Sequence, residues 1–294
     1  MVPDLYQAPY SALSEYGRRL LAEGDSWFTI GSLTFERAPN LLGQIDLPTS
    51  TAIVSCAYPG DTLQRMVDGV HDVWFDRLLR VRRYASYWDA ILFSAGGNDL
   101  IDACQVPARD ATGQPIPPAR RLLLTPDEAP PGPPARYLSE PGWTLLADYL
   151  RANLSLIVQR RDQGPSAGRP LFLHTYAVPT ARPAGAPGAP LGWLYPALVG
   201  MGIPETDWPA LTAELFGRLR ALLLAADAAS GSPHALADVH VFDSAAMTTI
   251  VPAQPGTRGD SGDWVNEIHL NTRGYVKMGR AFGAFIDATL AAYP

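Results

Sequence analysis

The sequence predicts an α/β protein in which a parallel β-sheet is covered by helices on both faces. Short apolar runs of strand length, rich in β-branched and aromatic residues, alternate with longer segments whose apolar residues recur at helical spacing. Such alternation is typical of βαβ units, whose strands run parallel and are buried on both faces. The predicted strands are residues 20–24, 51–58, 90–96, 170–178 and 239–245.

The segments between these strands have the pattern of amphipathic helices. Within residues 208–229, for example, Leu211, Leu215, Leu219 and Leu222 recur at helical spacing and would share one face. This leucine-rich face would pack on the sheet. The predicted helical segments are residues 62–84, 143–161, 208–229 and 274–293.

Proline is unusually frequent, and its distribution marks two long connections. The chain has 294 residues and 28 prolines, about twice the average proportion. Ten prolines fall within residues 107–141 and seven within residues 179–209. Proline lacks the amide hydrogen that the interior of a helix or a central strand requires. We therefore expect irregular insertions at about residues 105–141 and 179–209.

Composition and charge exclude several kinds of partner. The 29 Asp and Glu residues outnumber the 23 Lys and Arg residues, which gives a formal charge of −6, so we expect no binding to nucleic acid. No apolar stretch approaches the roughly 20 residues that a transmembrane helix needs. Residues 1–21 lack the pattern of a secretory signal, which favours a cytoplasmic protein. A secreted form whose signal has been removed is the alternative.

The chain has only two cysteines, Cys56 and Cys104. We expect both to be buried, reduced thiols, with a disulfide between them as the alternative. The cysteines and histidines lack the spacing of metal ligands, so the sequence predicts no metal site.

Unusual residues follow three of the predicted strands. GDSW at residues 24–27 follows the first strand, YPGDT at 58–62 the second, and GGND at 96–99 the third. A fourth segment, NEIHLNTRGY at residues 266–275, leads into the last helix. Ligands of such sheets bind at the carboxyl ends of the strands. Each motif alone consists of residues that are common in turns and helix caps. Four such motifs in this order are uncommon.

This ordered set resembles the four sequence blocks of the SGNH hydrolases, also called the GDSL esterase/lipase family. GDSW matches the serine block, AYPGDT at residues 57–62 the glycine block, GGND the asparagine block, and NEIHLN at residues 266–271 the histidine block. The resemblance implies a three-layer α/β/α, flavodoxin-like fold with a five-stranded parallel sheet. Because the first and last blocks would have to meet, we expect one domain over residues 1–294.

The resemblance implies roles that agree with the chemistry of each side chain. Ser26 would be the nucleophile and His269 its general base, since a serine hydroxyl needs a hydrogen-bonded base at neutral pH. The amide hydrogen of Gly60 and the side-chain NH₂ of Asn98 would bind the oxyanion. The implied activity is hydrolysis of acyl or acetyl esters of small molecules through an acyl-enzyme on Ser26, without metal or cofactor.

The sequence departs from the family at the triad acid. Members with a complete triad carry an aspartate three residues before the histidine, where this sequence has Asn266. In trypsin the same replacement lowers kcat about 10⁴-fold, because it favours the wrong histidine tautomer. Asp263 and Asn266 rank equally as the group that orients His269, followed by Glu267. A backbone carbonyl is a further alternative.

The replaced acid supports a second hypothesis, in which the protein is a catalytically weak or silent relative that binds an ester, a glycan or a partner in the same pocket. The joint presence of the other four site residues favours the enzyme. Asp25 is expected to fix the turn after the first strand, and His174 to be structural, with pocket lining as the alternative. Five aromatic residues suggest an apolar rim, with core packing as the alternative: Trp27, Phe28, Trp193, Tyr195 and Trp208.

Overall fold

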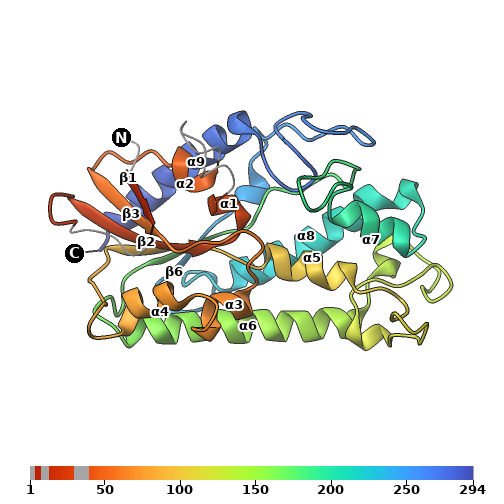
Figure 1. Ribbon diagram of the computed structural model, residues 1–294, viewed down its shortest axis with the longest axis horizontal. Helices are drawn as coiled ribbons and strands as arrows, with labels where there is room; N and C mark the ends of the chain where they lie inside the picture. Colours follow the sequence, from red (N-terminus) through yellow and green to blue (C-terminus); the bar gives the residue numbers. More distant parts are fainter. Residues whose placement is uncertain (1–3, 8–12, 30–39, 294) are drawn as a thin grey trace.

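A parallel sheet of six strands forms the centre of the computed structural model, which describes residues 4–7, 13–29 and 40–293 (Figure 1). The strands are β1 (Asp4–Gln7), β2 (Arg18–Gly24), β3 (Thr51–Ser55), β4 (Ala90–Ser94), β5 (Leu171–His174) and β6 (Val239–Phe242). Their order is β1-β3-β2-β4-β5-β6, and every pairing is parallel. All five predicted strands form, and β1, which was not predicted, extends the sheet at its edge.

Helices cover both faces of this sheet, which confirms the predicted three-layer architecture. The α-helices are α1 (Ser26–Thr29), α2 (Leu41–Gln44), α3 (Leu63–Asp68), α4 (Val73–Arg80), α5 (Gly97–Gln105), α6 (Glu140–Asp162), α7 (Leu194–Gly200), α8 (Trp208–Ala225) and α9 (Thr272–Leu290). Figure 1 shows α2 and α9 on one side of the sheet and α3, α4 and α6 on the other. No helix within the described residues is long and apolar enough to span a bilayer.

Two segments differ from the sequence prediction. The predicted helix over residues 62–84 is split into α3 and α4, because Gly69 adopts a left-handed conformation (φ +68°) that ends α3. Asp72 then caps α4 with its side chain. Residues 179–209 were expected to be irregular but contain α7. Pro196 is tolerated there because it lies in the first turn, where amide hydrogens lack helical acceptors.

The other proline-rich segment, residues 105–141, is irregular apart from short 3₁₀ helices. Buried Arg121 holds it together by donating to two backbone carbonyls and pairing with Glu128. The 3₁₀ helices of the described chain are η1 (Pro118–Arg120), η2 (Pro134–Tyr137), η3 (Glu205–Asp207) and η4 (Ser244–Ala246).

The carboxyl ends of β2, β3 and β4 bring three of the sequence motifs to one edge of the sheet. The amide of Asp25 donates to the carbonyl of Ser94 (3.1 Å), and the amide of Tyr58 to the carbonyl of Gly24 (2.9 Å). Gly24 packs so closely on β4 that an added Cβ would lie 2.8 Å from the Cβ of Ser94. The loops after these three strands therefore start side by side.

Candidate active site

Ser26 and His269 lie within hydrogen-bond distance of each other. The hydroxyl oxygen of Ser26 is 2.7 Å from Nε2 of His269, although 243 positions separate the two residues. Ser26 is the first residue of α1, directly after β2, and it is half-buried. His269 is buried, and this burial lowers its pKa to about 4. The ring is therefore neutral at neutral pH, and Nε2 can accept a proton.

The side chain of Asn266 contacts the other ring nitrogen of His269. Its Oδ1 lies 3.0 Å from Nδ1 and also accepts the backbone N–H groups of Ile268 (3.1 Å) and His269 (2.9 Å). Only an oxygen can accept these two N–H groups, so the oxygen of the amide, and not its NH₂, faces the ring. Nδ1 must then carry the hydrogen, which leaves Nε2 free to accept one from Ser26.

Asp263, which sequence spacing left equal to Asn266 as the partner of His269, binds other groups. Its Oδ2 is 2.6 Å from Nζ of Lys277 and accepts the N–H of Val251 at 2.7 Å. The lysine charge and the backbone amide hold this carboxylate, and they lower its pKa below the usual range against the effect of its burial. None of the hydrogen bonds among the described residues joins Asp263 to His269, so Asp263 is not the group that contacts Nδ1.

Glu267, the third candidate, is fully buried and binds the second proline-rich segment instead of the histidine ring. Burial raises its pKa to about 7, although four backbone N–H groups favour its charged form. Gly192 (φ +89°) passes so close that an added Cβ would lie 2.4 Å from the carboxylate. The N–H donors belong to Arg182 (3.1 Å), Trp193, Leu194 (2.9 Å) and Tyr195 (2.7 Å).

Residues 179–209 thereby become part of the surroundings of His269. The ring of Trp193 packs edge-on against the imidazole, with centroids 5.4 Å apart. The guanidinium of buried Arg182 donates to the backbone carbonyl of Asn266 (2.7 Å). Sequence reasoning missed Arg182 as a site residue and proposed Trp193 only as part of an apolar rim, because no motif links either residue to the histidine block.

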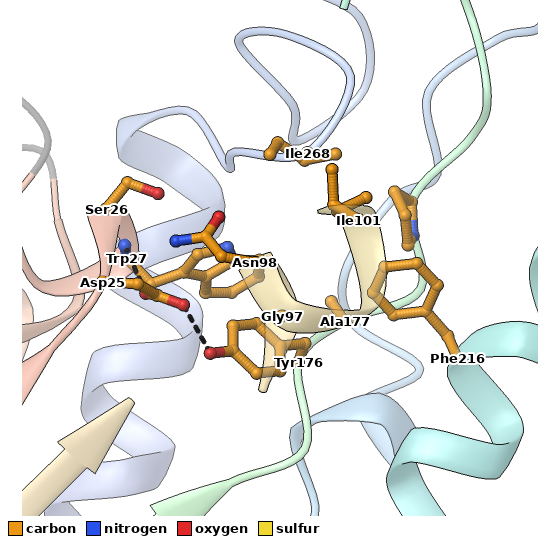
Figure 2. Close-up of a pocket in the computed structure, with 11 residues that line it drawn as sticks. Asp25, Ser26, Trp27, Gly97, Asn98, Ile101, Tyr176, Ala177, Phe216 and Ile268 are labelled. Carbon is orange, nitrogen blue, oxygen red and sulfur yellow. Dashed lines mark hydrogen bonds between the residues drawn. The ribbon is translucent and has the colours of Figure 1, made fainter. Parts of the chain in front are cut away.

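Asn98 and Gly60 lie at the same edge of the sheet as Ser26. The NH₂ group of Asn98, the second residue of α5, donates one hydrogen to the carbonyl of Asp61 (2.9 Å), so its other hydrogen remains for a further acceptor. Figure 2 shows this amide extending toward the Ser26 hydroxyl. Gly60 is exposed with φ +84°, and its N–H takes part in none of the backbone hydrogen bonds of the described chain.

A small pocket of about 20 Å³ opens between Ser26 and Asn98 (Figure 2). Its far wall is apolar, so it can accept a short hydrocarbon group next to the serine. This wall consists of Ile101 from α5, Ala177, Phe216 from α8 and Ile268.

A much larger groove of about 650 Å³ adjoins this pocket, and Pro179 lines both. Tyr195 and Trp208 line the groove, with ring centroids 5.5 Å apart, and half-buried Tyr195 fits the expected apolar rim. Trp27, Phe28 and Trp208 are buried, so the core alternative holds for these three residues, although Trp27 also lines the small pocket.

A buried polar network lies directly beneath Ser26. Asp25 accepts the hydroxyl hydrogens of Tyr176 (2.5 Å, dashed in Figure 2) and Ser94 (2.9 Å), and it accepts the amide hydrogen of Trp27 (3.0 Å). Nε2 of His174 lies 2.8 Å from the Ser94 hydroxyl, and burial lowers the pKa of His174 to about 3. Asp25 thus fixes its turn as expected, and His174 is a neutral structural residue.

Comparison with solved structures identifies the fold. A lipase from a goat rumen metagenome matches this chain with a TM-score of 0.52 and 14% identity, over 91% of this chain and 96% of the lipase. The chain shares its fold with this lipase, a three-layer α/β/α fold of the kind that the resemblance in sequence implies. A protein from Slackia heliotrinireducens assigned to the SGNH hydrolases (TM-score 0.42, 12% identity, 92% and 98% of the two chains) is also similar. A carbohydrate acetylesterase from Sinorhizobium meliloti is similar as well, with a TM-score of 0.47 and 14% identity over 92% of this chain and 99% of the acetylesterase.

These similarities to solved structures lie in the fold. No protein-family model matches the sequence, and no curated protein matches it significantly. The chemistry of the site is therefore argued below from the chain's own residues.

Proposed function

We propose that the protein is a serine esterase that hydrolyses carboxylic esters of small molecules through an acyl-enzyme on Ser26. The observation that carries this proposal is the 2.7 Å approach of the Ser26 hydroxyl to Nε2 of His269, whose Nδ1 faces the Asn266 oxygen. A nucleophile, a neutral base and a group that orients the base are the parts that acyl transfer requires. In this proposal the described chain works as one catalytic domain.

The proposed reaction uses His269 twice. Its Nε2 takes the Ser26 proton as the serine oxygen attacks the ester carbonyl, and the imidazolium then protonates the leaving alcohol as the carbon–oxygen bond breaks. Water, activated by the same nitrogen, hydrolyses the acyl-enzyme and regenerates Ser26. The amides of Ser26 and Gly60 and the free N–H of Asn98 would bind the oxyanion in both steps.

Asn266 makes this site differ from a complete triad. Its oxygen favours the correct tautomer of His269, but a neutral amide stabilises the imidazolium less than a carboxylate does. The proposed enzyme is therefore slow compared with one that has an aspartate at this position. The same observation favours the second candidate function, a silent relative that binds an ester or glycan in the pocket without cleaving it.

The two cavities suggest how a substrate would lie. The small apolar pocket beside Ser26 suits an acetyl or other short acyl group, and the adjoining groove with Tyr195 and Trp208 suits an apolar leaving group or a longer chain. The solved structure of a lipase has a similar fold, which supports an ester substrate.

The decisive experiment compares wild-type protein with Ser26→Ala on p-nitrophenyl acetate, butyrate and octanoate. We expect wild-type protein to release p-nitrophenol and Ser26→Ala to lose all but background release. Ser14→Ala, at an exposed position outside the site, is the matched control and should keep wild-type activity. Equal release by wild type and Ser26→Ala would reject the esterase. Absence of release combined with ester binding would favour the silent relative.

A further inference from the structure

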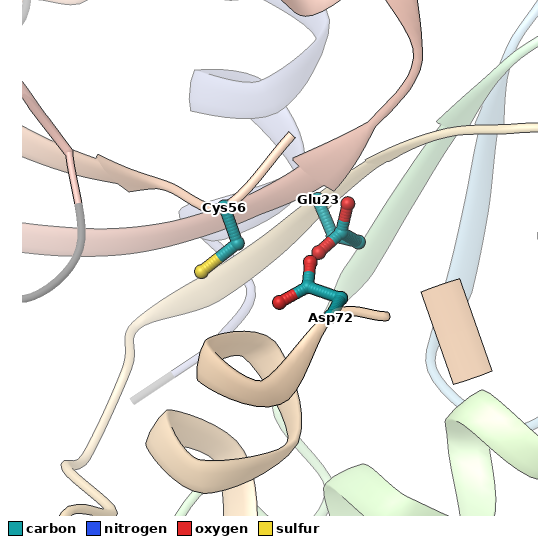
Figure 3. A group of neighbouring side chains, drawn as sticks. All are labelled: Glu23, Cys56 and Asp72. Carbon is teal, nitrogen blue, oxygen red and sulfur yellow. The ribbon is translucent and has the colours of Figure 1, made fainter. Parts of the chain in front are cut away.

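Three potential metal ligands meet beside the sheet, outside the proposed catalytic site. Glu23 lies in β2, Cys56 directly follows β3, and Asp72 caps α4. One carboxylate oxygen from each acid and the sulfur of Cys56 all lie within 4.8 Å of one another (Figure 3). None of the three residues lines the pocket at Ser26. They are far apart in the sequence, which explains why ligand spacing gave no signal.

The two carboxylates of this cluster each have a buried oxygen that no N–H or O–H donor reaches. Glu23 is 0% exposed and Asp72 is 8% exposed, and Oε2 of Glu23 and Oδ2 of Asp72 accept no hydrogen from a donor group. The two carboxyl groups lie within hydrogen-bond reach of each other instead. Their other oxygens are satisfied by the N–H of Gly24 and by two N–H groups at the start of α4. Figure 3 shows the two carboxylates facing each other next to the thiol.

Among the described residues, no Lys, Arg or His forms an ion pair with these two acids. Two buried carboxylates in this arrangement require either a shared proton or a bound cation.

We propose that Glu23, Cys56 and Asp72 bind a divalent cation of the zinc type. A thiolate beside two carboxylates suits Zn²⁺, whereas Mg²⁺ and Ca²⁺ prefer ligand sets made only of oxygen. Binding releases the thiol proton, and any proton shared by the carboxyl groups, to solvent. Three protein ligands leave one position of a four-coordinate ion for water. The ion would tie β2, β3 and α4 together.

The first test uses Co²⁺ as a spectroscopic probe on chelator-treated full-length protein. One equivalent of Co²⁺ should produce a thiolate-to-cobalt charge-transfer band, and Zn²⁺ should displace it. Cys56→Ala should abolish the band, whereas Cys104→Ala, at the other free cysteine, should keep it. A wild-type protein that gives no such band, or a band that survives in Cys56→Ala, would overturn the proposal.

The second test measures Zn²⁺ affinity by competition with a chromophoric chelator. Glu23→Gln should fold, because its new NH₂ can donate to Asp72, and it should bind Zn²⁺ at least about 10-fold more weakly than wild type. Glu15→Gln, at an exposed position, should bind as wild type does. Zn²⁺ should also raise the Tm of wild type and not of Glu23→Gln. Equal affinities in wild type and Glu23→Gln would show that a shared proton, and not a metal, explains the pair.

Discussion

The side-chain oxygen of Asn266 faces Nδ1 of His269 at 3.0 Å and is held there by the backbone N–H groups of Ile268 and His269. In trypsin an asparagine at the triad acid is harmful chiefly because it favours the wrong tautomer of the histidine. Here the backbone donors prevent that outcome. In the proposed reaction, the missing negative charge is then the main catalytic deficit that Asn266 would introduce.

Asn266→Asp should therefore raise kcat, by about 10- to 100-fold, which is less than the 10⁴-fold effect seen when the tautomer also changes. The carboxylate would keep the same backbone donors and would stabilise the imidazolium. Initial rates on p-nitrophenyl acetate measure the effect, with Asn153→Asp in α6 as the matched control. An unchanged or lower kcat for Asn266→Asp would contradict this account of the site.

The pH dependence of kcat/KM should report the depressed pKa of His269. Burial lowers this pKa from 6.5 to about 4, so the base stays neutral and active well below neutral pH, and activity should fall as the pH drops through about 4. Circular dichroism at each pH distinguishes protonation from acid unfolding. In Asn266→Asp the midpoint should move upward, because a carboxylate favours the charged ring. A wild-type midpoint near 6.5 would contradict the burial argument.

Removal of the Asn98 side chain should lower kcat by about 10²- to 10³-fold while changing KM little, because an oxyanion donor acts mainly in the transition state. Asn98 also donates to the carbonyl of Asp61, so Asn98→Ala could loosen that loop. Asn98→Asp is the second variant, since it keeps the size of the side chain and loses the N–H. Asn153→Ala is the control, and Tm measured for each variant separates catalysis from folding. An Asn98→Asp enzyme with wild-type kcat would exclude the oxyanion role.

Phe216 should limit the length of the acyl group, because its buried ring forms part of the apolar wall facing Ser26. Phe216→Ala should raise kcat/KM for octanoate relative to acetate by about 10-fold or more, as expected when a pocket gains room for methylene groups. Phe285→Ala, on α9 and away from the pocket, is the matched control. A ratio equal to that of wild type would place the acyl chain elsewhere, with the larger groove as the next candidate.

Glu267→Gln should destabilise the protein and slow the reaction. Both carboxylate oxygens accept backbone N–H groups, and an NH₂ in place of one oxygen would face donors instead. We expect a loss of about 2 to 4 kcal/mol in the free energy of unfolding, measured by urea titration. The exposed Glu15→Gln should leave this free energy unchanged. A Glu267→Gln protein as stable as wild type would show that the carboxylate does not hold residues 182–195.

Apolar periodicity predicted the central strands, because it is a local feature of the sequence. The pairing of Ser26 with His269 was implied only by the resemblance of the four ordered motifs to the SGNH hydrolases. The sequence did not predict β1, since a strand of four residues has too short a pattern. It also did not predict the break at Gly69, where one residue with a positive φ ends a helix whose apolar pattern continues.

Sequence spacing could not separate Asp263 from Asn266 as the partner of His269, because both lie within six residues before it and either side chain could reach the ring. The tertiary structure decided this through Lys277, which pairs with Asp263 from α9, and through the backbone donors that hold Asn266. The sequence likewise could not show which backbone groups bind Glu267, or that Cys56 and Asp72 lie beside Glu23. The sequence alone determined which side chains can perform the chemistry and on which strand ends they lie. Only the folded chain decided their partners, because the charge and orientation of a buried polar group depend on atoms brought from distant parts of the sequence.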